Sequence, residues 1–188
     1  MLTNEQKALL ETERGALRNY LISGGMEPLT FQRNDAYDMD SIVCASAWGC
    51  FRNYLRYMLL KLAAVLPCRL KVSFYRALGM KVGRDVCISP GVVIDPLFPQ
   101  LIELEDSVCL GMGCRLLTHD YTATAFRVGR IHIGKGSVVG AYSTVIAGVT
   151  IGSKVTVGGM SFVNSDVQDG LTVGGVPAKP LKSQKGGQ

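Results

Sequence analysis

The sequence predicts a mainly β fold, a solenoid of stacked coils, preceded by an α-helical extension. Three observations carry this prediction. From residue 82 onward aliphatic residues recur at every sixth position, glycine often follows them directly, and two insertions interrupt the series. A period of six fits neither an α-helix nor a single alternating strand. It fits short strands joined by tight turns, whose coils must stack to bury their apolar faces.

The repeat can be followed residue by residue. Twelve positions in this series are all Leu, Ile or Val: Val82, Ile88, Ile94, Leu104, Leu110, Leu116, Ile133, Val139, Val145, Ile151, Val157 and Val163. Four residues after each of them, most repeats have a small or β-branched residue, the last being Val167, after which the pattern ends. The strands of a β-sandwich would vary in spacing, so chance recurrence in such a fold is the weaker explanation. We expect the twelve side chains to share one core.

Two insertions break the series. The step after Ile94 is ten positions long instead of six, so four residues are extra, and the step after Leu116 is seventeen, so eleven are extra. Insertions in a solenoid form loops on one face and commonly carry the binding site. The longer insertion contains residues 118–121 (THDY) and ends in Arg127 and Arg130.

Helices are expected before the repeats. The first spans residues 4–21, the second about 50–66, and a shorter one follows up to Leu78. The apolar stripe of the second helix consists of Phe51, Leu55, Leu59, Leu62 and Leu66, with Arg52, Arg56 and Lys61 off it. We divide the chain into a helical extension or cap over 1–80, a repeat domain over 81–181 and a flexible tail over 182–188.

The charge of the chain is unevenly distributed. Residues 41–84 contain no Asp or Glu but eight Arg and Lys, within a net charge of +5. Such a block attracts anions such as phosphates or lipid head groups; we expect no nucleic-acid partner. Two explanations stay open and are compatible: contact with an anionic membrane through 50–84, or helices that cap the first coil and shield its strand edge. Capping is the favoured one.

Cysteine usage and the N-terminus indicate the cellular compartment. The six cysteines form no C-x-x-C pair, and no basic start followed by an apolar run opens the chain. We therefore expect reduced thiols in a cytoplasmic protein, with peripheral contact at the inner face of a membrane as an extension of the charge argument.

Three stretches resemble a known family. Residues 133–141 (IGKGSVVGA) and 149–152 (VTIG) resemble the hexapeptide-repeat acyltransferases, and 175–179 (GVPAK) resembles the closing motif of their sugar and xenobiotic O-acetyltransferases. The resemblance covers roughly residues 82–181. It implies a left-handed parallel β-helix, assembled as a homotrimer that binds acetyl-coenzyme A (acetyl-CoA) between neighbouring coils. Galactoside, maltose and exopolysaccharide O-acetyltransferases look most similar, which suggests a role in polysaccharide biosynthesis.

Acetyl transfer to an alcohol requires a base, because a hydroxyl is a poor nucleophile at neutral pH. The chain has two histidines, and His119 opens the long insertion, where a substrate could reach it. The catalytic histidine of similar enzymes also stands at the head of this insertion. We expect His119 to be the general base of a direct transfer without a covalent enzyme intermediate. His132, between Ile131 and Ile133, is expected to point away from the interior as a surface or subunit-contact residue.

A carboxylate that fixes the tautomer would make His119 a better base. Asp95, at the start of the shorter insertion, is the favoured candidate, and Asp120, adjacent to His119, is the alternative. Either aspartate could instead only form a turn. Asp95, Tyr121 and Arg127 are the candidate contacts for a small-molecule or glycan acceptor.

The resemblance also implies where acetyl-CoA lies. Gly140 and Ala141 align with a segment that contacts the cofactor in similar enzymes, and Gly159 with a second such turn. Lys179 and Lys182 match basic residues that meet its phosphates, which charge complementarity supports. Backbone N–H groups of such a glycine-rich coil could also stabilise the oxyanion of the intermediate.

Three other functions are less well supported by the sequence. A carbonic anhydrase of the γ type binds a metal through three histidines, and this chain has two, so we expect no metal. A non-catalytic scaffold would bind no acetyl-CoA. Within acetyl transfer, N-acetylation of an amino sugar and acetylation of an antibiotic or other small xenobiotic remain alternatives.

Overall fold

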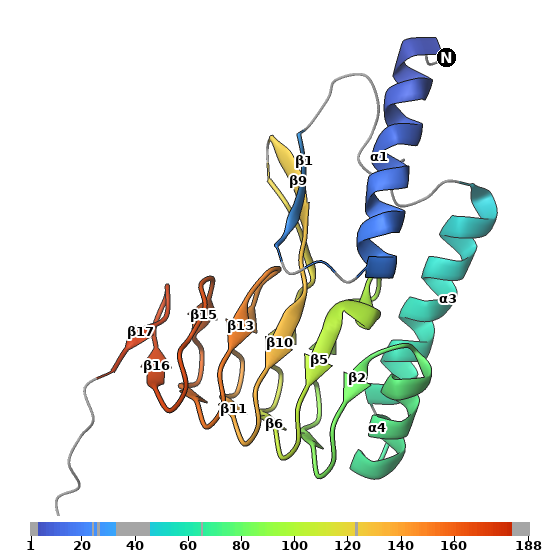
Figure 1. The fold of residues 1–188 in the computed structure, drawn as a ribbon. Helices are drawn as coiled ribbons and strands as arrows, with labels where there is room; N and C mark the ends of the chain where they lie inside the picture. The colour runs from blue at the N-terminus through green and yellow to red at the C-terminus, as the bar shows by residue number, and fades with distance from the viewer. Residues whose placement is uncertain are drawn as a thin grey trace, which may run out of the picture.

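The repeats form a left-handed parallel β-helix, as predicted (Figure 1). The computed structural model describes residues 4–23, 25, 27–32, 46–64, 66–122 and 124–181. The expected binding residue Lys182 therefore lies outside the described residues, as does Cys44. Three parallel sheets run along the β-helix, and successive coils add one strand to each.

The strands of each sheet follow one another at regular intervals of the sequence. The first sheet contains β2 (Lys81–Val82), β5 (Ile102–Leu104), β10 (Ile131–Ile133) and β13 (Thr150–Ile151). The second contains β3 (Cys87–Ile88), β6 (Cys109–Leu110), β11 (Val138–Val139), β14 (Thr156–Val157) and β16 (Thr172–Gly174), with β17 (Lys179–Pro180) antiparallel at its end. The third contains β4 (Val93–Ile94), β7 (Arg115–Leu116), β12 (Thr144–Val145) and β15 (Phe162–Val163).

The strand register confirms the six-residue repeat. Leu104 pairs with Val82 on one side and Ile133 on the other, and Ile133 pairs with Ile151. Each step thus aligns aliphatic residues once the insertions are left out. The twelve predicted side chains are buried, except for Val82 in the first coil, which is partly buried. They form one continuous apolar core, the driving force for a fold whose single coils cannot bury their own strands.

The β-helix extends further than the sequence pattern indicated. Val167, the last residue of the six-residue pattern, bridges to Ile151, and the coil then continues within the predicted 81–181, where Val173 of β16 pairs with Val157. Both valines are buried in the same core. The repeat is lost in sequence here because the spacing changes, although the coil continues.

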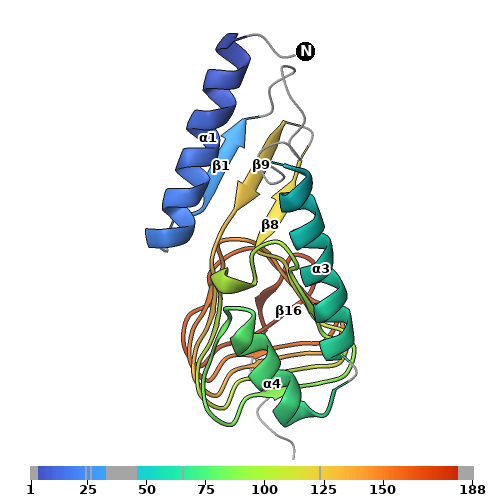
Figure 2. The ribbon, with the colours of Figure 1, turned by 90° about the vertical axis from the view of Figure 1, so that its right-hand side faces the viewer.

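Two helices cover the end of the β-helix at the first coil. They are α3 (Ala47–Ala64) and α4 (Cys68–Ala77), close to the expected 50–66 and the shorter helix up to Leu78. Figure 2 shows α4 lying across the end of the coils and α3 beside it. Val72 and Tyr75 of α4 and Leu60 and Ala63 of α3 join the core of the β-helix. These contacts shield the inward faces of the first coil from water.

Most of the predicted apolar stripe of this helix does not face the core, although Leu66 at its end packs against it. Phe51, Leu55 and Leu62, which the sequence places on that stripe, are exposed, whereas the buried side chains of α3 include Leu60 and Ala63. The helix therefore packs against the core through the side that carries Leu60 and Ala63. Periodicity indicated a helix with an apolar face but could not say what that face would contact.

A small antiparallel sheet, not expected from the sequence, projects from the β-helix (Figure 1). It consists of β1 (Leu29–Gln32), β9 (Ala125–Val128) and β8 (His119–Tyr121), in that order, and we call it the projecting sheet. Together with α1 (Asn4–Ser23) and the 3₁₀ helix η1 (Pro99–Leu101), it encloses a second core. The members of the second core are Leu10, Leu17, Tyr20, Phe31, Phe98, Leu101, Phe126 and Val128.

The described thiols of Cys50, Cys109 and Cys114 are free. Burial raises the pKa of Cys114 to about 12, so this thiol stays protonated and packs as a small apolar group. Among the described residues, no helix combines the length and apolarity needed to cross a membrane.

Candidate active site

The two insertions start at the same corner of the β-helix, which brings His119 and Asp95 together. Ile94 and Leu116 are register partners in the third sheet, so the chain leaves both strands side by side. Asp95 follows the first of them directly, and His119 begins β8 shortly after the second. Nδ1 of His119 lies 2.5 Å from Oδ2 of Asp95.

Asp95 is fully buried and anchored by backbone donors. Its Oδ2 accepts hydrogen bonds from the backbone N–H groups of Thr118 (2.8 Å) and His119 (3.1 Å), and its Oδ1 accepts one from Leu97 (2.9 Å). Burial alone would raise the pKa of Asp95, but the hydrogen bond and charge of His119 and the Leu97 N–H group lower it below its usual value. The carboxylate is therefore ionised at neutral pH.

This carboxylate sets the tautomer of His119. An ionised carboxylate only accepts hydrogen bonds, so Nδ1 must carry the proton, and Nε2 keeps its lone pair in the neutral ring. No described residue bonds Nε2, and the side chain of His119 is 19% exposed. The rings of Phe98, Tyr121 and Phe126 surround the imidazole at centroid distances of 6.1, 5.6 and 6.0 Å. The arrangement presents one basic nitrogen to the outside at a fixed orientation.

The alternative carboxylate, Asp120, has another partner. Its Oδ2 lies 3.2 Å from Nε of Arg127, and Arg127 also donates to the backbone oxygen of Ala147 at 2.7 Å. Neighbouring side chains of a strand point to opposite faces, which explains why Asp120 and His119 diverge on β8. The structure thus brings Asp95, not Asp120, to the histidine. Arg127 binds partners within its own chain, the side chain of Asp120 and the backbone of Ala147.

Tyr121 remains beside the histidine. Its ring stacks on Phe126 at 4.7 Å and is about half exposed. An exposed aromatic ring next to a base can pack against the apolar face of an acceptor.

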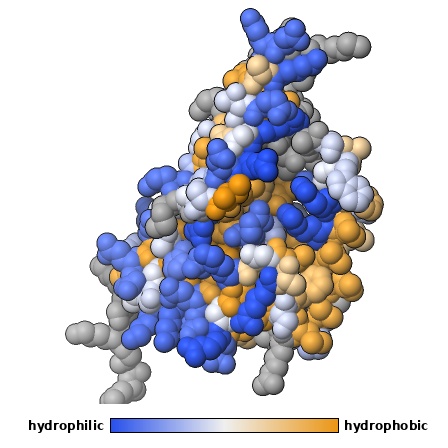
Figure 3. Space-filling view, turned by 45° about the vertical axis from the view of Figure 1, so that its right-hand side comes forward, coloured by the Kyte–Doolittle hydropathy of each residue, from blue (hydrophilic) through white to orange (hydrophobic). Residues whose placement is uncertain are grey.

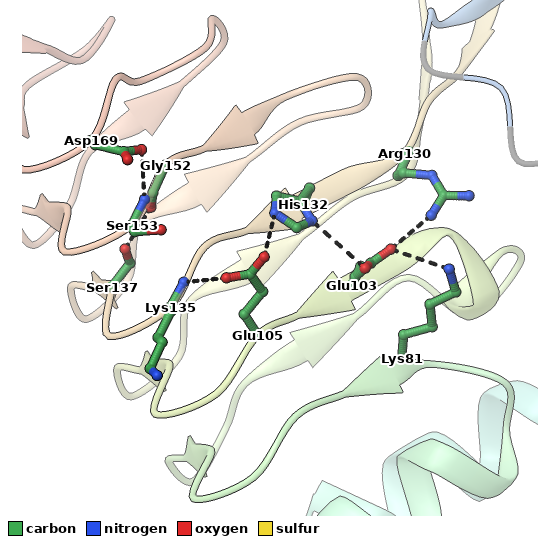
Figure 4. A network of polar contacts seen from close by, with 10 residues as sticks. All are labelled: Lys81, Glu103, Glu105, Arg130, His132, Lys135, Ser137, Gly152, Ser153 and Asp169. Atoms are coloured by element: carbon green, nitrogen blue, oxygen red, sulfur yellow. Dashed lines mark hydrogen bonds and ion pairs between the residues drawn. The ribbon is translucent and has the colours of Figure 1, made fainter.

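His132 lies on the outer face of the first sheet within a network of charged groups (Figure 4). Its Nε2 is 3.3 Å from Oε1 of Glu105, and its Nδ1 is 4.0 Å from Oε1 of Glu103. Oε2 of Glu103 in turn contacts Arg130 at 2.9 Å and Lys81 at 3.3 Å. As expected, His132 points away from the interior, and its ring nitrogens face carboxylates of the neighbouring coil.

The described residues that are expected to bind acetyl-CoA lie at a different corner of the β-helix. Gly140 and Ala141 follow β11, and Gly159 follows β14 one coil further on. A Cβ at Gly140 would come within 2.5 Å of the backbone nitrogen of Gly159, so only glycine permits this close stacking. The N–H groups of Ala141 and Gly159 donate to no described residue, so they could bind carbonyl groups of an extended ligand. Lys179 is exposed on β17.

One chain does not bring the two corners together. The glycine corner lies between the second and third sheets, whereas His119 lies where the chain passes from the third sheet toward the first. The width of the third sheet separates them.

Phe98, Phe126 and strand β1 were not expected beside the histidine from the sequence. Their signal was a short alternation of apolar residues, Leu29 and Phe31 in one segment and Phe126 and Val128 in the other. Two matching alternations of this kind could have suggested paired strands beside the histidine.

Comparison with known proteins adds to this geometry. No family model matches the chain. YvoF of Bacillus subtilis strain 168, which is assigned as an acetyltransferase, is 32% identical over 131 residues, or 69% of this chain and 76% of YvoF. Protein CapG of Staphylococcus aureus is 37% identical over 117 residues, or 57% of this chain and 68% of CapG.

Solved structures share the fold. A maltose O-acetyltransferase from Clostridium difficile 630 matches with a TM-score of 0.60 at 15% identity, covering 73% of this chain and 89% of that one. The hexapeptide-repeat acetyltransferase VCA0836 from Vibrio cholerae matches with a TM-score of 0.57 at 22% identity, covering 76% and 96%. VCA0836 has also been solved in complex with acetyl-CoA.

Proposed function

The chain belongs to the hexapeptide-repeat acetyltransferases, and we propose that it moves the acetyl group of acetyl-CoA to a hydroxyl of a sugar or polysaccharide precursor. The observation that carries this proposal is the contact of His119 with the buried, ionised Asp95. It holds the proton of the imidazole on Nδ1, so that the outward Nε2 can take a proton from the acceptor.

The transfer then follows from ordinary general-base chemistry. Nε2 of His119 removes the proton of the acceptor hydroxyl while its oxygen attacks the thioester carbonyl carbon. The tetrahedral intermediate collapses, the carbon–sulfur bond breaks, and the imidazolium returns the proton to the leaving thiolate. Asp95 stabilises the imidazolium during the interval, because its negative charge lies against Nδ1.

Acetyl-CoA as the donor is supported by the glycine corner. The N–H groups of Ala141 and Gly159 are directed at no other described group and suit the amide carbonyls of an extended chain. The basic residues Lys179 and Lys182 suit its phosphates. VCA0836, which shares the fold, binds acetyl-CoA.

We further propose that the enzyme acts as a homotrimer. Donor and base must meet, yet one chain holds the glycine corner and His119 on different edges of the β-helix. A neighbouring copy that places its glycine corner beside this histidine would complete the site, and such an assembly is what the family resemblance implies.

A hydroxyl is proposed over an amine for two reasons. The closing motif at 175–179 resembles that of O-acetyltransferases, and a maltose O-acetyltransferase shares the fold. N-acetylation of an amino sugar or a small xenobiotic uses the same base, so the acceptor must be tested directly.

The test is a panel of hydroxyl and amine acceptors, each incubated with acetyl-CoA. Release of the free thiol of coenzyme A measures the turnover. We expect turnover with a sugar hydroxyl and almost none with His119→Ala. Turnover with amines alone would move the assignment to N-acetylation. A protein whose melting temperature does not rise with acetyl-CoA, and which turns over no acceptor, would be a scaffold instead.

A further inference from the structure

The strongest unexplained feature of the molecule is the solvent face of α3. Large apolar or aromatic side chains occupy it along the whole helix, and we call them the α3 apolar face. They are Trp48, Phe51, Tyr54, Leu55, Tyr57, Met58 and Leu62, all exposed. Soluble proteins rarely expose contiguous apolar patches of this kind unless something binds there.

The face is a continuous strip because of its spacing. Positions 48, 51, 55, 58 and 62 alternate by three and four residues, which places them on one side of the helix. Leu60 and Ala63, which bind the helix to the core of the β-helix, lie on the other side. In Figure 3 hydrophobic surface gathers at the lower right, the side on which Figures 1 and 2 place α3 and α4. Within the described part of the chain, the strip therefore remains uncovered after the helix has docked.

The charges carried by α3 itself are of one sign. Residues 41–84 contain no Asp or Glu, while Arg52 and Lys61 on α3 are exposed. The ammonium group of Lys61 lies 5.3 Å from the ring centre of Tyr57, so its charge stays at the border of the aromatic surface. Tryptophan and tyrosine prefer the head-group level of a bilayer, and basic side chains there reach the lipid phosphates.

We propose that the α3 apolar face docks on the surface of an anionic phospholipid bilayer, with the helix lying in the plane of the head groups. An amphipathic helix with apolar and aromatic residues on one side and only positive charges beside them has the chemistry of such a surface. A second copy fits less well, because pairing two of these faces would bring Arg52 and Lys61 of both copies together with no acid to neutralise them. The proposal is independent of the acetyl transfer.

The fluorescence of Trp48 can report binding of this face to lipid vesicles. Trp48 is the only tryptophan of the chain and is 71% exposed on this face. We expect its fluorescence emission to move to shorter wavelength when the full-length protein is mixed with phosphatidylcholine vesicles containing roughly one-third phosphatidylglycerol. The protein should sediment with these vesicles at low salt, bind much less to pure phosphatidylcholine, and bind more weakly as salt rises.

A pair of variants tests whether this face is responsible. Leu62→Glu changes a side chain that is 57% exposed on the strip, and we expect it to weaken vesicle binding on the order of tenfold or more. Ile22→Glu makes the same chemical change at a position of α1 that is 76% exposed, and it should bind like the parent. Both sites are at the surface, so both variants should melt close to the parent temperature.

Three results would overturn the proposal. The first is an emission spectrum that anionic vesicles do not change at low salt. The second is equal weakening by Leu62→Glu and Ile22→Glu, which would indicate a general charge effect. The third is short-wavelength Trp48 emission without lipid that is lost on dilution, which would show that a second copy covers the face.

Discussion

The β-helix and the projecting sheet are built on opposite principles. The β-helix repeats one inward aliphatic side chain at every rung, and its core contains no histidine. The projecting sheet, with α1 and η1, has no repeat and is held by eight side chains from four separate segments. The repeated part supplies a rigid frame, and the interruptions of the frame position the chemistry.

The two histidines show the same difference on a small scale. His132 belongs to a regular rung and faces Glu103 and Glu105 of the neighbouring coil. His119 belongs to an interruption, where Asp95 takes one ring nitrogen and the other remains without a described partner. Only the second arrangement leaves a base available to a substrate.

Replacing each histidine by alanine is the most direct way to break this comparison. Loss of a general base typically lowers the rate on the order of 10²–10⁴-fold, so His119→Ala should lose most acetyl transfer. His132→Ala removes a surface contact and should keep a rate within about twofold of the parent. Steady-state thiol release with the best acceptor measures both. Near-normal turnover by His119→Ala would remove the assignment of the base.

A second pair of variants distinguishes the contribution of each core to stability and to turnover. Leu110 is fully buried in the β-helix, and Leu110→Ala should lower the free energy of unfolding by about 2–5 kcal/mol while the folded enzyme keeps its kcat. Phe31 of β1 stacks near Phe126 at 6.1 Å in the second core, and Phe31→Ala should lower kcat because the strands beside His119 loosen. Chemical unfolding and turnover, measured below the melting temperature of each variant, decide the matter. Equal loss of kcat in both variants would mean that the frame and the site are not separable.

The sequence predicted the frame well because its physics is periodic. Each rung needs an aliphatic side chain at the same place, so Val82 to Val163 could be assigned to one core from spacing alone. The interruptions were visible as well, since they break the spacing. The meeting of Asp95 and His119 was favoured in advance, because Asp95 starts the shorter insertion and His119 opens the longer one. The pairing of Ile94 with Leu116 explains why the two side chains meet.

The remaining features depend on contacts that a single sequence does not encode locally. Strand β1 pairs with β9 almost a hundred residues later, and short strands of four residues carry little signal of their own. The orientation of α3 depends on which side meets the first coil, and the apolar stripe alone could not say what it would contact. Asp120 was a reasonable neighbour of His119 in sequence, but strand alternation directs it to Arg127.

The variant Asp95→Asn should lower kcat less than His119→Ala does. An amide has one acceptor oxygen, so it cannot accept from Leu97 on one side and from Thr118 and His119 on the other, as both carboxylate oxygens do. We expect kcat to fall about 10- to 100-fold through loss of the tautomer and of imidazolium stabilisation. The KM for acetyl-CoA should change little, and the acid limb of the pH–rate profile should shift. An unchanged pH profile would reduce Asp95 to a purely structural residue.

The smallest expected effect is on stability at low pH. The pKa of Asp95 is lowered in the folded protein, so the unfolded chain binds the proton first as the pH falls. The stabilisation by this carboxylate is therefore complete above its unfolded pKa of about 3.9 and disappears as the pH drops through the folded value. Urea unfolding at several pH values should show a steeper acid loss for the parent than for Asp95→Asn. Asp85→Asn, which removes an exposed carboxyl, is the control and should follow the parent. Parallel curves for the parent and Asp95→Asn would mean that the corner where both insertions start contributes no more to acid stability than the rest of the surface.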